Sequence, residues 1–203
     1  DQDTFAFSSQ EKYQLALAAG KWKEEMIPVE ITENKQPTIF DTDEHPRKTT
    51  IEKLAGLKPA FAKDGTVTAG NSSGINDGAA ALILVNETTL RKLNLTPLAR
   101  VAAMAIAGVD PSIMGVGPVP AMKKAVHRAG IGLNDLDLVE LNEAFASQSI
   151  ACMRDLNLNP ALVNVNGGSI ALGHPLGASG SRIATTLLYE MRRRKVRWGA
   201  ASM

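Results

Sequence analysis

The feature that most constrains the fold is a regular alternation of strand-like and helix-like patterns in the second half of the chain. Apolar runs typical of strands alternate with stretches of helical spacing, beginning near residue 99. The expected strands are residues 99–108, 136–143, 161–167 and 196–202, and the expected helices are residues 117–130, 144–158 and 178–195. This alternation predicts an α/β domain in which helices cover a sheet.

The first half of the chain is less regular. Residues 1–20 have apolar residues near helical spacing and end on Gly20, which predicts a helix. The other expected elements are a strand at 26–31, a polar, proline-containing excursion at 33–50, a buried strand at 80–85 and a short helix at 88–95.

The charge balance excludes some classes of partner. With 22 basic and 21 acidic residues, the net charge is +1, so the chain lacks the positive field that binds nucleic acid or an acidic membrane surface. No apolar run approaches the ~18 residues that span a membrane. The densest basic run, residues 192–197, follows a helical pattern. We expect it to be a solvated helix end, with a contact to an anionic ligand or partner as the alternative.

Neither the cysteine nor the histidines suggest a metal or disulfide framework. Cys152 is the only cysteine, so no internal disulfide can form. It lies in an expected helix among small apolar residues, where we expect it to pack rather than to act as a nucleophile. His45, His127 and His174 are scattered without paired carboxylates, so no metal site is predicted.

Polar residues stand where one expected strand ends. Asn142 and Glu143 close the strand-like run "LVELNE" immediately before an expected helix. Ligands of α/β sheets usually bind at such strand ends, and a buried polar group there needs a partner. The simpler alternative is that Asn142 only caps the helix that follows.

A glycine-rich stretch surrounds one histidine. In "NVNGGSIALGHPLGASGSR", residues 164–182, five glycines lie between Gly167 and Gly180, and His174 precedes a proline. The residue before proline avoids the helical region, which favours an extended or turn geometry at His174. We expect the glycines to let a ligand or another backbone approach the imidazole. A neutral imidazole can accept a proton from a thiol or donate a hydrogen bond to a developing oxyanion.

Together, "NEAFA" at 142–146 and the stretch at 164–182 closely resemble the thiolase family, the acetyl-CoA acetyltransferases and 3-ketoacyl-CoA thiolases. Residues 65–82 and 108–121 are also similar to thiolase segments, so the resemblance covers all 203 residues. Ketosynthases share the fold and a glycine-rich histidine turn, but they do not carry these two motifs.

The resemblance implies an α/β fold, the layered αβαβα arrangement of thiolases, in an incomplete form. It assigns residues 1–75 to the latter part of the thiolase loop domain, 76–97 to a remnant of the N-terminal domain and 98–203 to an incomplete C-terminal domain.

The resemblance also implies an activity, which is the Claisen condensation of two acyl-CoA molecules or its thiolytic reverse. CoA and acyl-CoA are then substrates, and no cofactor is expected. By motif match, His174 is the base that activates the nucleophilic thiol. It also lines an oxyanion hole with a water held by Asn142.

Five further matches imply contacts with CoA. Arg47 in "DEHPR" would meet the nucleotide phosphate or adenine, and Ala69 and Ser73 in "AGNSS" would touch the pantetheine. Met114 in "SIMG" and Phe145 in "NEAF" would line the acyl and pantetheine channel.

Thiolases also use two catalytic cysteines that these residues do not include. On the resemblance, the nucleophile would precede Asp1 and the second cysteine would follow immediately after Met203. We therefore expect the chain to act as part of a longer enzyme and to be inactive alone. The alternatives are a CoA-binding module without turnover and a truncated, non-functional product.

The resemblance implies a setting as well as an activity. The full-length form is expected to be a homo-oligomer, either a dimer or a tetramer, with neither nucleic acid nor membrane as a partner. Its expected place is the cytoplasm, or mitochondria or peroxisomes if the source is eukaryotic.

Overall fold

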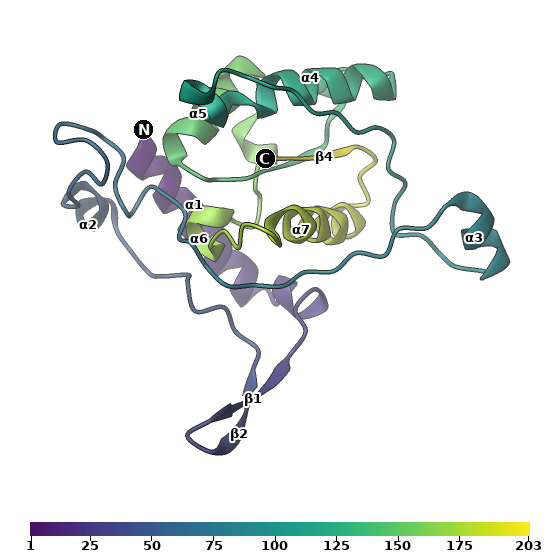
Figure 1. The fold of residues 1–203 in the computed structure, drawn as a ribbon, viewed down its shortest axis with the longest axis horizontal. Coiled ribbons are helices and arrows are strands. Elements are labelled where there is room, and N and C mark those ends of the chain that lie inside the picture. Colours follow the sequence, from purple (N-terminus) through teal and green to yellow (C-terminus); the bar gives the residue numbers. More distant parts are fainter.

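The computed structural model describes all 203 residues and has a layered α/β body from which two short helices and a β-hairpin protrude (Figure 1). The helices are α1 (Gln2–Ala18), α2 (Ile51–Ala55), α3 (Glu87–Lys92), α4 (Pro118–Ala129), α5 (Ala146–Asp155), α6 (Ser169–Leu172) and α7 (Ser179–Arg194). The strands are β1 (Val29–Glu33), β2 (Gln36–Phe40), β3 (Leu138–Leu141) and β4 (Gly199–Ser202). Short 3-10 helices lie at Lys21–Glu24, Pro111–Val116, Leu133–Asp135 and Pro160–Leu162.

The body has three layers. Strands β3 and β4 pair in parallel, from Leu138 opposite Gly199 to Leu141 opposite Ser202. Helix α7 packs on both strands, and α4 packs on β4 from the other side, where α4 also contacts α5. Helix α1 lies against α5 and α6. The α/β prediction for the second half of the chain is therefore confirmed.

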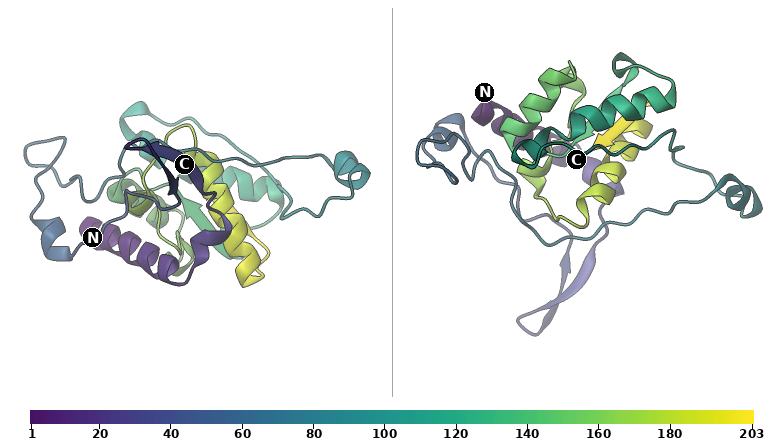
Figure 2. Two further views of the ribbon diagram at one scale, coloured as in Figure 1. Left: turned by 90° about the horizontal axis from the view of Figure 1, so that it is seen from below. Right: turned by 45° about the horizontal axis from the view of Figure 1, so that its top comes forward.

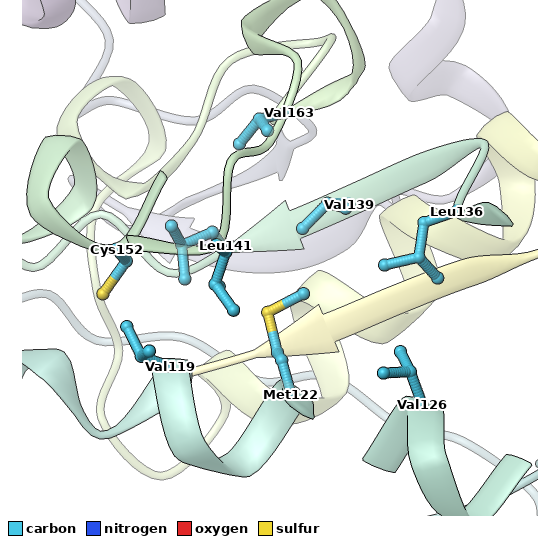
Figure 3. Close-up of a cluster of buried hydrophobic side chains, with 9 residues drawn as sticks. Val119, Met122, Val126, Leu136, Val139, Leu141, Cys152 and Val163 are labelled. Carbon is cyan, nitrogen blue, oxygen red and sulfur yellow. The ribbon is translucent and has the colours of Figure 1, made fainter. Parts of the chain in front are cut away.

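The main core forms between α4, α5 and the strands. Helix α4 begins with Pro118, whose missing N–H is unneeded in the first turn. It ends at Gly130 with φ +72°, a left-handed conformation that glycine adopts freely. Its side chains at i, i+3 and i+7 make one buried face. The core cluster, drawn in Figure 3, consists of Val119, Met122, Val126, Leu136, Val139, Leu141, Cys152, Leu156 and Val163.

One expected strand, residues 161–167, is reduced to a single bridge. Val163 pairs in parallel with Val139, but Asn164 has φ +45° and turns the chain away. The Asn164 side chain then replaces the missing ladder. Its Oδ1 accepts from the Leu141 amide at 2.8 Å, and its Nδ2 donates to the Leu141 carbonyl at 2.8 Å. The prediction of a strand at 161–167 is wrong, because beyond Val163 the Asn164 side chain, and not the backbone of a strand, pairs with the Leu141 backbone.

Two other expected strands do not form. Residues 80–85 and 99–108 are extended but pair with no strand, and their apolar side chains include Ile83 (92% exposed) and Ile106 (89% exposed). A β-strand needs a neighbouring strand for its backbone hydrogen bonds, and no segment of these 203 residues takes that place. The apolar pattern was strand-like, yet the predictions of strands and of burial at 80–85 are wrong.

A hairpin covers part of the strand expected at 26–31 and continues into the excursion expected at 33–50. Strands β1 and β2 pair antiparallel and protrude from the body (Figure 2), joined by Asn34 and Lys35 with φ of 49° and 64°. Two central residues of positive φ make the hairpin turn that matches strand twist. The sequence did not indicate this turn, because such turns usually contain glycine and this one is formed by Asn34 and Lys35.

The basic run at the end of α7 is only partly a solvated helix end. Arg192 is exposed, whereas Arg193 and Arg194 bind the Glu190 carboxylate, the latter with Nε 2.6 Å from Oε1. Burial would raise the pKa of Glu190, but hydrogen bonds from Asn166, Arg194 and Arg193 outweigh it and lower that pKa to about 2.

No helix in the structure has the length and apolar character required to cross a bilayer.

Candidate active site

The two residues singled out by the sequence lie side by side. Asn142 follows β3 directly and is buried, and His174 follows α6 in a half-buried position. Asn142 Nδ2 lies 3.3 Å from His174 Nε2 although 32 residues separate them in sequence. The carboxyl end of β3 and the histidine turn thus meet at one edge of the sheet, where α/β proteins usually bind ligands.

The helix-cap alternative for Asn142 is wrong. Helix α5 has Phe145 at its N-cap, and no side chain caps it. The side chain of Asn142 instead accepts a hydrogen bond at Oδ1 from Ser169 Oγ, at 2.6 Å. Its amide is therefore held between Ser169 and His174.

The backbone of His174 is tied to a distant loop. The His174 amide donates to the Gly74 carbonyl at 3.0 Å and to Asn76 Oδ1 at 3.2 Å. A parallel bridge between Ile75 and His174 adds to this contact. The imidazole is therefore positioned from both sides of the turn, by the 74–76 segment and by α7.

The imidazole of His174 is kept neutral at physiological pH. Burial lowers its pKa, and the nearby Arg182 guanidinium lowers it further. Its Nδ1 lies 2.6 Å from Ser179 Oγ. A neutral imidazole in a partly open position can act as a proton acceptor.

The glycines around His174 make room for the protein itself. A Cβ on Gly168 would overlap the carboxylate of Glu143, and one on Gly173 would overlap the Asn76 amide. Gly173 also has a φ of +92°, a backbone conformation that residues with a side chain rarely adopt. At both positions, side chains of the same chain fill the space in which a ligand or another backbone was expected. At Gly167 another backbone does approach, because a Cβ there would lie 2.7 Å from the Ser9 carbonyl oxygen.

Glu143 has a structural role, because its buried carboxylate binds other parts of the chain and contacts neither Asn142 nor His174 by a hydrogen bond. Its carboxylate accepts hydrogen bonds from Ser9 Oγ at 2.7 Å, Asn164 Nδ2 at 2.8 Å and the Ile170 amide at 3.1 Å. Burial raises the pKa of Glu143, while the hydrogen bonds from Ser9, Asn164 and the Ile170 amide and the charge of Lys12 oppose that rise. Glu143 therefore joins α1 and α6 to the segment that follows β3.

Two of the five residues matched to CoA contacts lie near the pair. The Ser73 amide donates to the Ala144 carbonyl at 3.0 Å, two residues beyond Asn142. Phe145 pairs with Ser72 in an antiparallel bridge, and its ring meets Phe61 edge-on at 5.7 Å. Ser73 and Phe145 are thus held together at the same strand end.

The other three matched residues lie on the surface. Ala69 and Arg47 are exposed, and the Arg47 amide donates to Gln10 Oε1 at 3.1 Å. Met114 is 71% exposed in the 3-10 helix before α4. No hydrogen bond connects these three side chains to Asn142 or His174, so their assignment stays a prediction.

Cys152 packs in the core, as the sequence indicated. It is fully buried in the core cluster, and its Sγ donates to the Gly115 carbonyl at 3.3 Å. Burial raises the pKa of its thiol. A buried thiol with a raised pKa supplies little thiolate, which is the nucleophilic form.

Sequence reasoning missed the residues that hold the pair. Asn76, Ser169, Ser179 and Arg182 all contact Asn142 or His174, either directly or through one hydrogen bond. Ser169, Ser179 and Arg182 stand within the quoted glycine-rich stretch. Asn76 lies 98 residues before His174, and nothing local in the sequence signals that contact.

The chemistry available here is acid–base and hydrogen-bonding chemistry. No group of three or more His, Cys, Asp or Glu side chains is arranged to hold a metal ion. The pair offers a neutral imidazole next to a fixed amide, which can accept a proton and stabilise negative charge on an oxygen.

Comparison with known proteins identifies relatives over the whole chain. Residues 95–203 match the family model "Thiolase, C-terminal domain", and residues 1–88 match "Thiolase, N-terminal domain". An acetyl-CoA acetyltransferase of Paracoccus denitrificans is 54% identical over 204 residues, covering 100% of this chain and 52% of the relative.

Solved structures agree with the sequence relatives. Human mitochondrial 3-ketoacyl-CoA thiolase superimposes with a TM-score of 0.95 at 49% identity, covering 100% of this chain and 52% of that one. The same human enzyme in complex with CoA gives a TM-score of 0.88 at 46% identity, covering 100% and 51%. The chain thus spans about half the length of the relatives it matches.

Proposed function

The chain belongs to the thiolase family, and from this we propose that it carries the histidine–asparagine part of the active site of an acyl-CoA C-acyltransferase. The reaction is the Claisen condensation of two acyl-CoA molecules or the thiolytic cleavage of a 3-ketoacyl-CoA. The two relatives described above are named for these two directions of one chemistry.

One observation carries the proposal, namely the contact between His174 Nε2 and Asn142 Nδ2 at 3.3 Å. In the proposed reaction, the neutral His174 takes the proton of a thiol, which becomes the nucleophile that attacks the thioester. Asn142 holds a water that, with His174, stabilises the oxyanion of the thioester. The thiol itself is not Cys152, which is buried away from the pair.

CoA and acyl-CoA enter the proposal as substrates, and the reaction requires no cofactor. Ser73 and Ala69 would contact the pantetheine, and Phe145 and Met114 would line the channel. Arg47 would meet the nucleotide phosphate or adenine. The support is the motif match at each position, the contacts of Ser73 and Phe145 near Asn142, and the existence of a relative's structure with CoA.

Assembly and location are part of the same proposal. The full-length protein would be a homo-oligomer, either a dimer or a tetramer, with acyl-CoA as its partner and neither nucleic acid nor membrane. It would act in the cytoplasm, or in mitochondria or peroxisomes if its source is eukaryotic. The human relative is named as mitochondrial.

The test uses a chimeric thiolase, in which these 203 residues replace the matching segment of the Paracoccus denitrificans relative. His174→Ala should lower kcat for acetoacetyl-CoA thiolysis by about 10²–10⁴-fold, because the proton acceptor is lost. Asn142→Ala should lower it by about 10²-fold or more, because one stabiliser of the oxyanion is lost.

His127→Ala is the matched control, because His127 is exposed on α4 and its ring contacts neither Asn142 nor His174. It should leave both the rate and the melting temperature of the unmodified chimera unchanged. Asn142→Ala should also lower the melting temperature, because Ser169 Oγ loses its buried hydrogen-bond acceptor. Near-normal rates in His174→Ala would show that the base assignment is wrong. An unmodified chimera that binds CoA without turnover would favour the CoA-binding alternative.

A further inference from the structure

A continuous chain of side-chain hydrogen bonds runs through the Asn142–His174 pair. It passes, in order, through Arg182, Ser169, Asn142, His174, Ser179 and the carbonyl of Pro175. The first group of this chain, the Arg182 guanidinium, and the last, the Pro175 carbonyl, differ in their hydrogen-bonding capacity. A guanidinium can only donate hydrogen bonds, and a backbone carbonyl can only accept them. The direction of every hydrogen bond between these ends can therefore be worked out.

At the donor end, Arg182 fixes the orientation of the asparagine amide. Its Nη2 donates to Ser169 Oγ at 2.9 Å, so the Ser169 hydroxyl hydrogen is free for its other neighbour. That neighbour is Asn142 Oδ1, at 2.6 Å. With Oδ1 facing Ser169, the NH₂ group of Asn142 faces His174, and His174 Nε2 must accept its hydrogen bond.

At the acceptor end, the Pro175 carbonyl, which also accepts from the Ala178 and Ser179 amides at 2.8 Å each, agrees with this direction. Ser179 Oγ lies 3.0 Å from that carbonyl and has one hydrogen, which it donates there. With Nε2 accepting from Asn142, Ser179 Oγ accepts a hydrogen bond at its other contact, His174 Nδ1 at 2.6 Å. His174 Nδ1 therefore carries the proton, and Nε2 carries the lone pair.

We propose that Ser179 is a positioning residue that holds neutral His174 in the Nδ1–H tautomer, with Nε2 unprotonated and able to take the proton of a thiol in place of its hydrogen bond from Asn142. This rests on the proposed function for the role of His174, but not for the tautomer. Ser179 is fully buried at the start of α7, three residues before Arg182 on the same helix. One turn of α7 thus supplies both a donor end of the chain and the contact that fixes the proton on Nδ1.

The tautomer has a direct consequence for catalysis. A neutral imidazole has one nitrogen that donates and one that accepts, and the partner of the first decides which nitrogen remains free. In the opposite tautomer, Nε2 would already carry a proton and could not accept one from the thiol. Ser179 therefore acts through His174, without touching the reacting atoms.

The first test is ¹⁵N NMR of the 203-residue chain with ¹⁵N-labelled histidine at about pH 8, where a histidine is neutral. Protonated and unprotonated ring nitrogens have well-separated shifts, and His174→Ala identifies the signals of His174. We expect a protonated Nδ1 and an unprotonated Nε2. A majority of the Nε2–H form, which free histidine favours in water, would overturn the inference, and this measurement needs no Ser179 variant.

The second test compares Ser179→Ala with Ser181→Ala. Ser181 lies on the same helix, and its hydroxyl contacts neither Asn142 nor His174. Ser179→Ala leaves the Asn142 contact in place but removes the acceptor of the Nδ1 proton, so it should reduce the share of the Nδ1–H form. In the chimeric thiolase it should lower kcat by roughly tenfold or more while KM is kept. Ser181→Ala should change neither, and an unchanged tautomer and rate in Ser179→Ala would contradict the inference.

The two proposals fail in different ways. If His174→Ala kept normal thiolysis, the proposed function would fail whatever the tautomer. If His174 were required for turnover but its Nδ1 were unprotonated, only the role of Ser179 would fail.

Discussion

Gly168 occupies a position near the site that has no room for a side chain. Gly168 begins the turn into α6, and its α-carbon lies against the carboxylate of Glu143, which three hydrogen bonds hold in place. A rigidly bound carboxylate cannot move aside as the free end of a surface side chain can. The glycine at position 168 is therefore set by this buried contact.

Gly168→Ala should lower the free energy of unfolding by about 1–3 kcal/mol, because the new methyl group forces Glu143 or the α6 turn to shift. Urea unfolding followed by circular dichroism measures the change. Gly177→Ala is the matched control, since a Cβ there meets no atom within 4 Å. Equal stability in the two variants would show that the contact at Gly168 is not restrictive.

The role of Asn142 is decided by its neighbours rather than by its position along the chain. Its place just before a helix is compatible with capping, yet Ser169 and His174 hold its side chain away from the α5 backbone. A side chain makes the hydrogen bonds that its surroundings offer. For Asn142, these come from residues about thirty positions later in the sequence, as the contacts show.

At the scale of elements, strand β3 divides its side chains between two layers. Val139 and Leu141 enter the core cluster with α4 and α5, because alternate residues of a strand point to opposite faces. Glu140 points the other way, toward α7, with its Oε2 3.9 Å from Arg182 Nη1. Burial raises the pKa of Glu140 to about 8, since the attraction to Arg182 only partly offsets the loss of hydration.

This gives stability a pH dependence of definite sign. The folded protein holds a proton on Glu140 up to about pH 8, whereas the unfolded chain releases it near its usual pKa of 4.5. The folded state therefore binds more protons between these values, and the free energy of unfolding should fall as pH rises from about 4.5 to 8. The slope is about 1.4 kcal/mol per pH unit for each such proton.

Glu140→Gln should flatten this dependence, because glutamine has no proton to release. Unfolding free energies measured in urea at several pH values between 5 and 8 test it. Glu11→Gln, an exposed position on α1, is the control and should leave the slope unchanged. Glu25, whose pKa burial raises to about 7, should maintain part of the slope in both variants. An identical slope in Glu140→Gln and the unmodified chain would contradict the prediction.

At the scale of the whole molecule, these 203 residues offer one thiol for a reaction that begins with a thiolate. That thiol, Cys152, is buried, its pKa is raised by burial, and it faces the Gly115 carbonyl. The purified 203-residue chain should therefore show no thiolysis of acetoacetyl-CoA in the presence of CoA.

The measurement is the loss of acetoacetyl-CoA absorbance, with the chimeric thiolase as the positive control. Robust turnover by the chain alone would overturn the proposed roles, because the chemistry would then have to use Cys152 or another group. Acylation of Cys152, detected by peptide mass spectrometry, would identify that route.

Much of the helical structure could be predicted from the sequence. Helices α4, α5 and α7 lie within the predicted ranges because a helix satisfies its hydrogen bonds locally and shows its buried face as a 3.6-residue period. Strands β3 and β4 also lie within predicted ranges, which apolar runs in the sequence indicated. The division into segments 1–75, 76–97 and 98–203 rests on the family resemblance and stays a prediction.

Other features depend on the tertiary structure. Residues 80–85 and 99–108 have the composition of strands but find no partner, whereas Asn164 ends a strand early by pairing its side chain with Leu141. The sequence by itself determined the positions of helices α1, α4, α5 and α7, of strands β3 and β4, and of the two residues at the site. The tertiary structure alone decided which strands pair and how Ser169, Ser179 and Arg182 orient that pair, because these contacts join residues whose proximity no local pattern encodes.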